Sequence, residues 1–377
     1  MRVAFYAPLK APDHARPSGD RLIGRMLVAA LAQHGHHVEI ASRFRSLDLG
    51  GHARRQARLR RYGEWLATKL ARHCLAVPLE QRPQLWLTYH LYAKAPDWLG
   101  PTVAAALGIP YVVVEASVTP KQATGPHADG HQAVIAGLGQ ARLVLSINPK
   151  DEAGVLPHLT GPGQHQRLAP FIDGSLFRQA RAESGTHRLA LATAYNLDLN
   201  QPWLITVAMM RPGDKLASYR VLAETLGLLP KPWQLLVIGD GDARSQVEAL
   251  MAQPGVVFLG ERSRPEIAQA LGAADVFIWP AINEAIGMAL IEAQAAGLPV
   301  IAANRPGIAA VVADGKTGIL CEEGQSRPLA NALHKLMIKA PPTIAAIGKR
   351  ASTHARRNHD ITTAGAVFAG KLEALIR

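Results

Sequence analysis

Short apolar runs alternate with helical patterns along most of the chain, and this alternation constrains the fold more than any other feature. Apolar runs of strand length recur in both halves, and apolar residues at helical spacing lie between them. Strands that alternate with helices form parallel sheets covered by helices, so the sequence predicts an α/β protein. The expected strands are 3–6, 37–41, 85–88, 111–114, 143–146, 203–207, 234–238, 256–259, 276–278 and 299–301.

The length indicates two domains, because 377 residues exceed what one hydrophobic core usually holds. Residues 171–200 lose the apolar periodicity and contain several turn dipeptides. We therefore expect one domain in residues 1–170, a connection in 171–200 and a second domain in 201–350.

The stretch from Trp279 to Ile301 is interpreted as a strand end, a loop, a helix, a stop and a new strand. Asn283 is expected to cap a helix over 284–296, because its side chain can accept from amides of the first turn. Gly297 occupies the position of a left-handed C-terminal residue, after which the helix stops.

Two carboxylates belong to this expected helix. Glu284 at its mouth and Glu292 would lie about 12 Å apart along the axis, which suits two ends of an extended ligand. Gly287 would leave the backbone of the first turn open to an anion. The alternative is that Glu284 is a first-turn acid favoured by the helix dipole and Glu292 a solvated residue.

Several polar positions in the first half follow expected strands. Ser18 and Gly19 lie between the first strand and the first helix, where α/β sheets bind phosphate, although an ordinary turn would have the same composition. His90, Glu115 and Ser117 fall at strand ends, and His131 follows a turn. Each of the four is more often a structural residue by itself, but together they indicate a cleft edge.

The net charge of +12 is unevenly distributed. Residues 1–180 contain 21 Lys and Arg against 12 Asp and Glu, a balance of +9 that leaves +3 for residues 181–377. Residues 43–72 are strongly basic and have leucines at helical spacing, namely Leu59, Leu66 and Leu70. The alternatives are a solvated basic face or binding to an anionic membrane surface or an acidic acceptor. Nucleic acid is disfavoured, because aromatic residues at base-stacking spacing and nucleic-acid motifs are missing from the sequence.

The two cysteines support no disulfide framework and lack metal-ligand spacing. Because the chain opens on an expected strand, we expect no signal peptide, and no apolar run approaches the length of a membrane span. We expect a cytoplasmic protein that can also contact the inner face of the membrane. Oligomeric state is left open.

Six short motifs occur in order between residues 235 and 320. They are Leu235-Leu-Val-Ile-Gly-Asp-Gly-Asp242, Val257-Phe-Leu-Gly260, Ala273-Ala-Asp-Val276, Asn283-Glu284 to Glu292-Ala293, Ala296-Gly-Leu-Pro-Val300 and Asp314-Gly-Lys-Thr-Gly318. In this series the chain resembles the retaining nucleotide-sugar glycosyltransferases of family 4. The resemblance implies the GT-B fold: two Rossmann-like domains facing across a cleft, with the last helix, 351–377, returning to the first domain.

The resemblance also implies residue roles. Glu284 would hold the donor sugar and Glu292 the ribose, with Lys215 meeting the donor diphosphate. The family usually has an arginine earlier in the loop that contains this lysine, where Met209 stands here, and the nearest arginine is Arg211. We therefore expect Glu284, Lys215 and Arg211 to be the catalytic residues. Donor binding is assigned to Gly19, Ser18, Glu292, Gly287, Ile286, Asn283 and Gly239, and the acceptor or cleft edge to His90, Glu115, Ser117 and His131.

No metal or cofactor is expected, because Asp240-Gly-Asp242 reads as a strand-to-helix turn. The implied function is retaining transfer of a sugar from a nucleotide-diphosphate sugar to a cell-envelope, polysaccharide or lipid-linked acceptor. The alternative is a non-catalytic or phosphorylase-like GT-B protein that binds a nucleotide or a sugar phosphate.

Overall fold

The computed structural model describes residues 1–15, 18–161, 163–339 and 341–376. The chain divides into two compact units, one formed by Met1–Pro170 with Ala364–Arg377 and the other by Phe171–Thr363. Each unit contains a six-stranded sheet in which every named strand pair is parallel. The expected α/β class is therefore confirmed.

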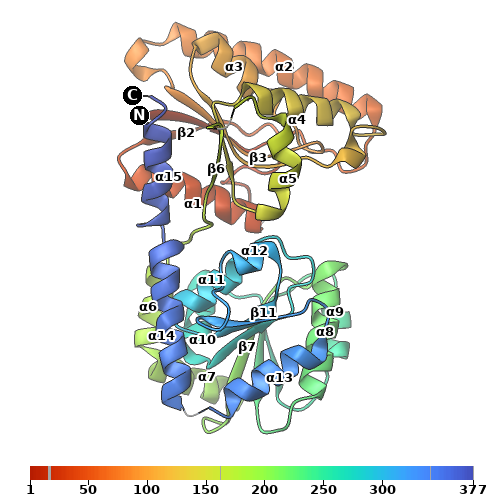
Figure 1. Ribbon diagram of the computed structural model, residues 1–377, viewed down its shortest axis with the longest axis vertical. Helices are drawn as coiled ribbons and strands as arrows, with labels where there is room; N and C mark the ends of the chain where they lie inside the picture. The colour runs from red at the N-terminus through yellow and green to blue at the C-terminus, as the bar shows by residue number, and fades with distance from the viewer. Residues whose placement is uncertain (16–17, 162, 340, 377) are drawn as a thin grey trace. The chain divides into compact units, whose positions relative to one another are not determined.

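The sheet of unit 1 has the strand order β2-β1-β3-β4-β5-β6. Among its helices, α2 packs beside α3, and α15 packs beside α1, as Figure 1 shows. The strands are β1 (Arg2–Tyr6), β2 (His37–Ser42), β3 (Leu85–Tyr92), β4 (Tyr111–Ser117), β5 (Leu143–Ser146) and β6 (His165–Arg167). The α-helices are α1 (Gly19–Gln33), α2 (Ala53–Ala76), α3 (Gly100–Leu107), α4 (Ala128–Gln140), α5 (Glu152–Val155) and α15 (Ala364–Glu373).

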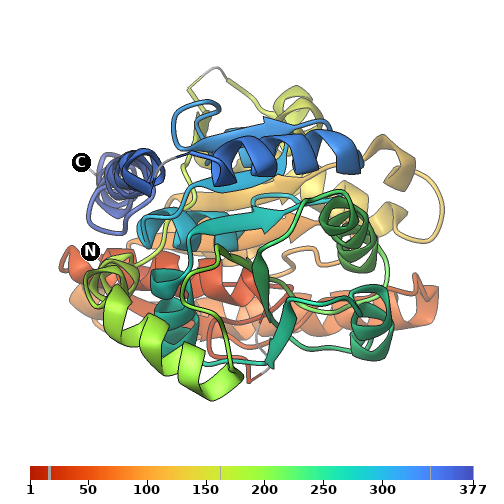
Figure 2. The ribbon, with the colours of Figure 1, turned by 90° about the horizontal axis from the view of Figure 1, so that it is seen from below.

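The sheet of unit 2 has the order β12-β11-β10-β7-β8-β9. Helices α8, α9 and α13 pack together, and α6, α7, α10, α11 and α14 form a second group (Figures 1 and 2). The strands are β7 (Trp203–Val207), β8 (Gln234–Ile238), β9 (Val256–Gly260), β10 (Val276–Trp279), β11 (Val300–Ala303) and β12 (Gly318–Cys321). The helices are α6 (Ser175–Ala182), α7 (Ser184–Tyr195), α8 (Asp214–Gly227), α9 (Arg244–Leu250), α10 (Arg264–Ala273), α11 (Met288–Ala295), α12 (Pro306–Ala309), α13 (Ser326–Met337) and α14 (Pro341–Asn358).

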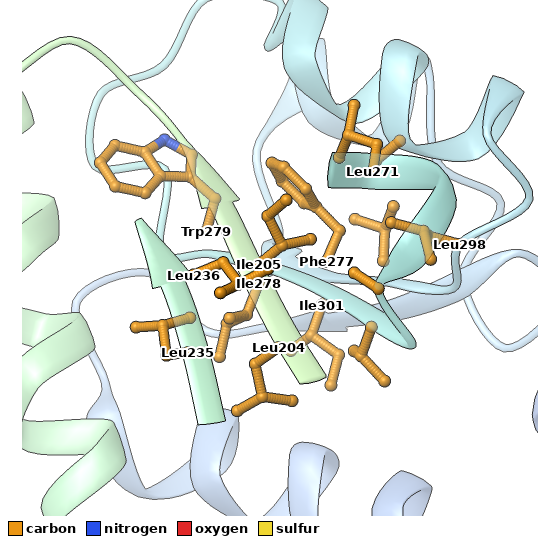
Figure 3. Packing of buried hydrophobic residues seen from close by; sticks show 14 of the residues in the cluster. Leu204, Ile205, Leu235, Leu236, Leu271, Phe277, Ile278, Trp279, Leu298 and Ile301 are labelled. Carbon is orange, nitrogen blue, oxygen red and sulfur yellow. The ribbon is translucent and has the colours of Figure 1, made fainter. Parts of the chain in front are cut away.

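The core of unit 2 forms on the central strands, whose side chains are buried on both faces of the sheet. Leu204, Leu235 and Ile301 are each fully buried and pack within one cluster, shown in Figure 3. Strands covered on both sides need an unbroken apolar run rather than an alternating one, and this is why these segments were easy to recognise in the sequence.

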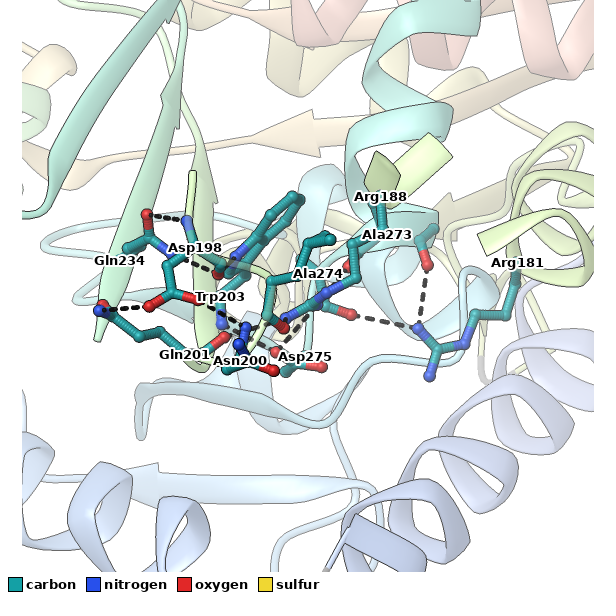
Figure 4. A network of polar contacts seen from close by, with 12 residues as sticks. Arg181, Arg188, Asp198, Asn200, Gln201, Trp203, Gln234, Ala273, Ala274 and Asp275 are labelled. Atoms are coloured by element: carbon teal, nitrogen blue, oxygen red, sulfur yellow. Dashed lines mark hydrogen bonds and ion pairs between the residues drawn. The ribbon is translucent and has the colours of Figure 1, made fainter. Parts of the chain in front are cut away.

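Residues 171–200, expected to be a connection, belong to unit 2, where they form α6 and α7. Polar contacts tie this segment to the amino ends of the strands (Figure 4). Arg188 donates to the Asp275 carboxylate at 3.1 Å, and its guanidinium lies 4.2 Å from the Trp203 ring centroid. Trp203 Nε1 in turn donates to the Asp198 carbonyl at 3.0 Å. The C-terminal return to unit 1 begins at Ala364 rather than at residue 351.

Each sheet has one point at which the direction of strand addition reverses. In unit 2 it lies between β7 and β10, and in unit 1 between β1 and β3. The loops that follow such a strand pair diverge to opposite faces of the sheet and leave a crevice at its carboxyl edge, where α/β proteins bind ligands. The fold thus gives each unit its own ligand-binding edge.

Candidate active site

The carboxyl edge of the unit 2 sheet brings Lys215 and Glu284 together. Lys215 lies in the first turn of α8, after β7, and Glu284 lies in the loop after β10. The ammonium of Lys215 donates to Glu284 Oε2, and both side chains are one-fifth exposed. The predicted catalytic pair therefore lies at the reversal point of the sheet.

Trp279, the last residue of β10, supports this pair. Its indole Nε1 donates to Glu284 Oε2 at 3.3 Å, and the Lys215 ammonium lies 5.2 Å from its ring centroid. Tyr219 packs edge-on against the same ring, with centroids 5.0 Å apart, and donates its hydroxyl to the Ala208 carbonyl. The indole thus contacts both charged groups and is held in place from α8.

The prediction that Asn283 caps a helix over 284–296 is wrong. Helix α11 begins at Met288, and Gly287, with φ of 70°, is its N-cap residue. Asn283 itself has φ of 48°, and its side-chain amide donates to Asp214 at 3.0 Å. Glu284 therefore lies in a loop, and the 12 Å separation expected along one helix does not apply.

Tertiary contacts give this loop its shape. The backbone N–H of Asn283 donates to the Glu323 carboxylate at 2.8 Å, and the side-chain oxygen of Asn283 accepts from Arg305 at 3.1 Å. These contacts hold Asn283 in a left-handed backbone conformation, which Ala281 shares with a φ of 54°. The C-terminal stop is confirmed: Gly297 has φ of 73°, and Leu298 N–H donates to the Ala293 carbonyl as in a Schellman motif.

Two glycines permit close backbone contacts around the site. A Cβ on Gly239, where φ is 146°, would lie 1.9 Å from the Ala208 carbonyl oxygen. A Cβ on Gly307 would lie 1.6 Å from the Ala285 carbonyl oxygen. The absence of side chains at these two positions therefore allows the β8–α9 turn to contact the loop before α8 and allows α12 to contact the loop that carries Glu284.

Glu292 lies inside α11 and is buried, with its side chain 11% exposed. Arg264, the first residue of α10, places Nη2 at 3.7 Å from Glu292 Oε1. Burial raises the pKa of Glu292 to about 7, although the positive charge of Arg264 lowers it. The alternative that Glu292 is a solvated helix residue is therefore excluded.

The raised pKa of Glu292 predicts a measurable dependence of stability on pH. The unfolded chain releases this proton near its usual pKa, while the folded chain keeps it up to about pH 7, so the Glu292 contribution to stability falls as pH rises between these values. We expect Glu292→Gln to remove this fall and to stabilise the ligand-free protein at pH 8 by about 1–3 kcal/mol. Thermal unfolding at pH 5 and pH 8 measures it, with exposed Glu261→Gln as the control. An identical pH profile in Glu292→Gln and wild type would contradict the assignment.

The remaining predicted residues of unit 2 have different surroundings. Arg211 is exposed in the β7–α8 loop, and no ion pair is seen for its side chain within the described residues. Ile286 is partly buried and packs against the core of unit 2. Asp240 accepts from the Gly241 amide and pairs with Arg244, and α9 begins after Ala243 without a carboxylate cap. Within the residues that the structure describes, no cluster of His, Cys, Asp or Glu could hold a metal ion.

In unit 1 the reversal point between β1 and β3 brings Asp20 and His90 together. Asp20 lies in the first turn of α1, and its carboxylate contacts His90 Nδ1 at 2.9 Å. Ser18 is the N-cap residue of the helix, where its hydroxyl accepts from Arg21 N–H and from Lys10. Pro17, which directly precedes Ser18 in the chain, lies outside the described residues. Gly19 is the first residue of α1.

His90 and Glu115 share an unusual backbone. Both have a left-handed φ, 64° for His90 and 62° for Glu115. The two residues occupy equivalent positions on β3 and β4, because the residues before them pair with each other and so do the residues after them. Glu115 accepts from the amides of Ile147 and Asn148 at 2.7 and 3.1 Å, while burial raises its pKa to about 7. The bonded Asp20 carboxylate overcomes burial and raises the pKa of His90. Left-handed non-glycine residues persist where surrounding contacts hold them, commonly at functional sites.

The last two positions predicted in unit 1 are placed differently. Ser117 ends β4 and is partly exposed, whereas His131 is buried in α4, one turn after His127. Ser117 therefore lies at a strand end, as expected, whereas His131 is a buried residue of a helix.

The structure adds residues that the sequence reasoning missed, namely Trp279, Arg264 and Asp20. An aromatic residue directly before Pro280 and the Glu284 loop was the available signal for Trp279. Arg264 had a weaker signal, because its link to Glu292 depends on how α10 packs. Asp20 directly follows the two predicted loop residues Ser18 and Gly19.

Comparisons with known proteins give a family for part of the chain and a fold for the whole of it. Residues 201–339 match the family described as glycosyl transferases group 1. D-inositol 3-phosphate glycosyltransferase of Mycobacteroides abscessus is 29% identical over 236 residues, which cover 58% of this chain and 51% of that protein. The protein of the same name from Rhodococcus erythropolis is 30% identical over 224 residues, covering 56% and 49%. HepE of Anabaena, solved with UDP and glucose, has a TM-score of 0.72 at 18% identity over 100% of both chains, and its UDP-glucose complex has a TM-score of 0.71 at 19% identity over 100% of both chains.

These findings identify residues 201–339 as a glycosyl transferases group 1 domain within an α/β fold of the GT-B type. The chain therefore contains a domain of this family and has the GT-B fold. It spans about half the length of the curated relatives it matches, so its donor, acceptor and reaction are proposals.

Proposed function

We propose that the protein transfers a sugar, with retention of configuration, from a nucleotide-diphosphate sugar to a hydroxyl acceptor. The observation that carries this proposal is the Lys215–Glu284 pair at the reversal point of the unit 2 sheet. The match to the group 1 family covers both residues. UDP is the first choice of nucleotide, because HepE was solved with UDP and with UDP-glucose.

Each side chain has a part that follows from its chemistry. Breaking the glycosidic bond leaves positive charge on the sugar and negative charge on the departing diphosphate. Lys215 supplies a cation for the diphosphate, together with the amides of the first turn of α8. Glu284 accepts from sugar hydroxyls once a phosphate has displaced it from Lys215. No metal is required in this scheme.

Glu292 is assigned to the ribose of the donor. A buried carboxylate can accept from both ribose hydroxyls and regains in those bonds the solvation that it lacks without ligand. Because these bonds require the ionised carboxylate, donor binding is coupled to ionisation of Glu292. Donor affinity is therefore expected to rise as pH rises through about 7.

A donor panel tests the proposal directly. UDP, GDP and ADP, each free and as a sugar conjugate, are compared for their effect on the melting temperature, which rises by mass action for any ligand of the folded state. The preferred donor is then incubated with candidate acceptors, and proton NMR identifies the anomer of the new bond. Failure of every nucleotide to raise the melting temperature, or an inverted anomer, would refute the proposal.

The acceptor is assigned to the cell-envelope, polysaccharide or lipid-linked class. The curated relatives are named for D-inositol 3-phosphate, so this small phosphorylated polyol belongs in the acceptor panel as well. Asp20 and His90 are the groups of unit 1 expected to meet an acceptor hydroxyl, because they lie at the reversal point of that sheet.

Arg211→Ala tests whether Arg211, which lies two positions after the family's usual arginine, helps to bind the diphosphate. Its side chain is exposed beside the first turn of α8, so removal should leave the melting temperature unchanged. We expect UDP affinity to fall about tenfold, the effect of losing one charge-assisted contact. Titration calorimetry measures it, with exposed Arg220→Ala on the same helix as the control. Unchanged affinity would remove Arg211 from the site.

A further inference from the structure

The outward face of α2 carries a continuous stripe of basic residues with an exposed tryptophan among them. Positions 54, 58, 61, 65, 69 and 72 are spaced by three or four residues, which places them within an arc of about 80° at about 100° per residue. All six are exposed. Along the axis the stripe is about 27 Å long. The residues of this stripe are Arg54, Arg58, Arg61, Trp65, Lys69 and Arg72.

Most of the charge in the stripe is available to a partner. Arg54, Arg58, Arg61 and Arg72 have no ion pair or side-chain hydrogen bond with any residue that the structure describes. The two other arginines of α2 are engaged, Arg55 near Asp48 at 3.7 Å and Arg60 with Glu64 at 2.8 Å. Glu64 is the sole acid in α2 and lies outside the stripe. The face therefore has strong, uncompensated positive charge.

The opposite face of α2 fixes the helix to unit 1. Gly63, Ala67 and Ala71 are buried, and a Cβ on Gly63 would lie 2.5 Å from Trp98. Leu66 and Leu70 pack against the core of unit 1, so two of the three leucines at helical spacing are used inside the protein. Figure 1 shows α2 as a long helix packed beside α3. The stripe is therefore presented on a rigid element.

Exposed aromatic and aliphatic residues accompany the cations. Trp65 and Tyr62 are 50% and 49% exposed, with ring centroids 5.4 Å apart. The Lys69 ammonium lies 4.2 Å from the Trp65 centroid. Leu75 and Leu79, 44% and 77% exposed, follow where the helix ends. Cations mixed with tryptophan, tyrosine and leucine match a phospholipid surface, where phosphates lie beside the acyl boundary.

We propose that the stripe on α2 docks unit 1 onto an anionic phospholipid surface. Phosphate headgroups pair with the four free arginines, and Trp65, Tyr62 and the two terminal leucines enter the headgroup layer. A nucleic acid fits less well, because base stacking needs an open ring face and Lys69 already covers Trp65. This proposal is independent of the sugar donor and of the reaction.

The test compares two variants that lose the same charge. The stripe variant combines Arg54→Gln, Arg58→Gln, Arg61→Gln and Arg72→Gln. The control variant combines Arg220→Gln, Arg327→Gln, Lys335→Gln and Lys349→Gln, four exposed cations of unit 2. Each protein is sedimented with vesicles of phosphatidylglycerol and phosphatidylcholine in equal parts, and with phosphatidylcholine alone.

We expect wild type and control to bind the anionic vesicles at roughly 0.1 M salt and to be released at roughly 1 M, where the Debye length is only about 3 Å. The stripe variant should bind roughly 600-fold more weakly, since each of the four basic residues contributes about fivefold at an anionic surface. Trp65→Ser should weaken binding several-fold while leaving the salt dependence intact. UDP-induced shifts of the melting temperature should be the same in all four proteins, which separates this result from the proposed function.

Three outcomes would overturn the proposal. They are equal binding by the stripe and control variants, no binding of wild type to anionic vesicles at the lower salt concentration, and displacement of bound vesicles by an equal charge of single-stranded RNA. The last result would assign the stripe to nucleic acid instead.

Discussion

Glu284→Ala and Lys215→Ala are each expected to lower kcat/KM for sugar transfer by roughly 10- to 100-fold, while the fold is retained. One charge-assisted contact is worth about 1.5–3 kcal/mol. Each substitution removes one such contact between the protein and the donor, to the sugar for Glu284 and to the diphosphate for Lys215. Among the residues that the structure describes, Lys215→Ala also leaves the Glu284 carboxylate with only the 3.3 Å bond from Trp279. Steady-state kinetics with the preferred donor measure the effect, and circular dichroism shows whether the fold is intact.

The double variant distinguishes a working pair from two independent contacts. If the residues act as a unit, combining the two substitutions should cost little more than the worse single substitution. Asp214→Ala serves as a comparison for these variants. Asp214 lies beside Lys215 and accepts a hydrogen bond from Asn283, so its loss should alter the loop that carries Glu284 without removing the charge of Lys215 or of Glu284. Near-normal turnover in Glu284→Ala or Lys215→Ala would exclude that residue from the site.

The ten strands expected from the sequence all occur, because buried parallel strands require continuous apolar runs that are visible without tertiary information. The two additional strands, β6 and β12, are the edge strands at the ends of the two sheets. Their sequences, His165-Gln-Arg167 and Gly318-Ile-Leu-Cys321, are short, and an edge strand needs less apolar surface than a central one. Composition therefore identified every central strand and the edge strands β2 and β9, and missed the other two edge strands.

The main residues of the candidate site could be listed from the sequence, whereas their geometry could not. Lys215 and Glu284 are 69 positions apart in sequence, and their pairing follows from the strand order at the reversal point. The start of α11 could not be read locally, since Asn283 is a good capping residue in any sequence. Its actual partners, Asp214, Glu323 and Arg305, come from distant segments. Loops shaped by such contacts lie beyond what local propensity can specify.

Gly307→Ala is expected to destabilise unit 2 and to impair the site together, although Gly307 itself carries no reactive group. The added methyl would lie 1.6 Å from the Ala285 carbonyl oxygen, so either α12 or the loop that holds Glu284 must move. Overpacking of this kind commonly costs about 1–3 kcal/mol, and each kcal/mol lowers the melting temperature by about 2–4 °C in a unit of this size. Because Ala285 directly follows Glu284, we also expect weaker pairing with Lys215 and at least a tenfold loss of kcat/KM. Calorimetry and kinetics on one preparation measure both effects.

Gly185→Ala provides the matched control for this substitution. Gly185 lies in α7, is exposed, and has no atom within 4 Å of the position its Cβ would take. The same methyl group should therefore leave activity unchanged and stabilise the helix by up to about 1 kcal/mol, since alanine is the better helix former. If Gly307→Ala behaved like Gly185→Ala in both measurements, the close contact between α12 and the Glu284 loop would have no role in shaping the site. A fall in melting temperature without loss of turnover would assign that contact to stability alone.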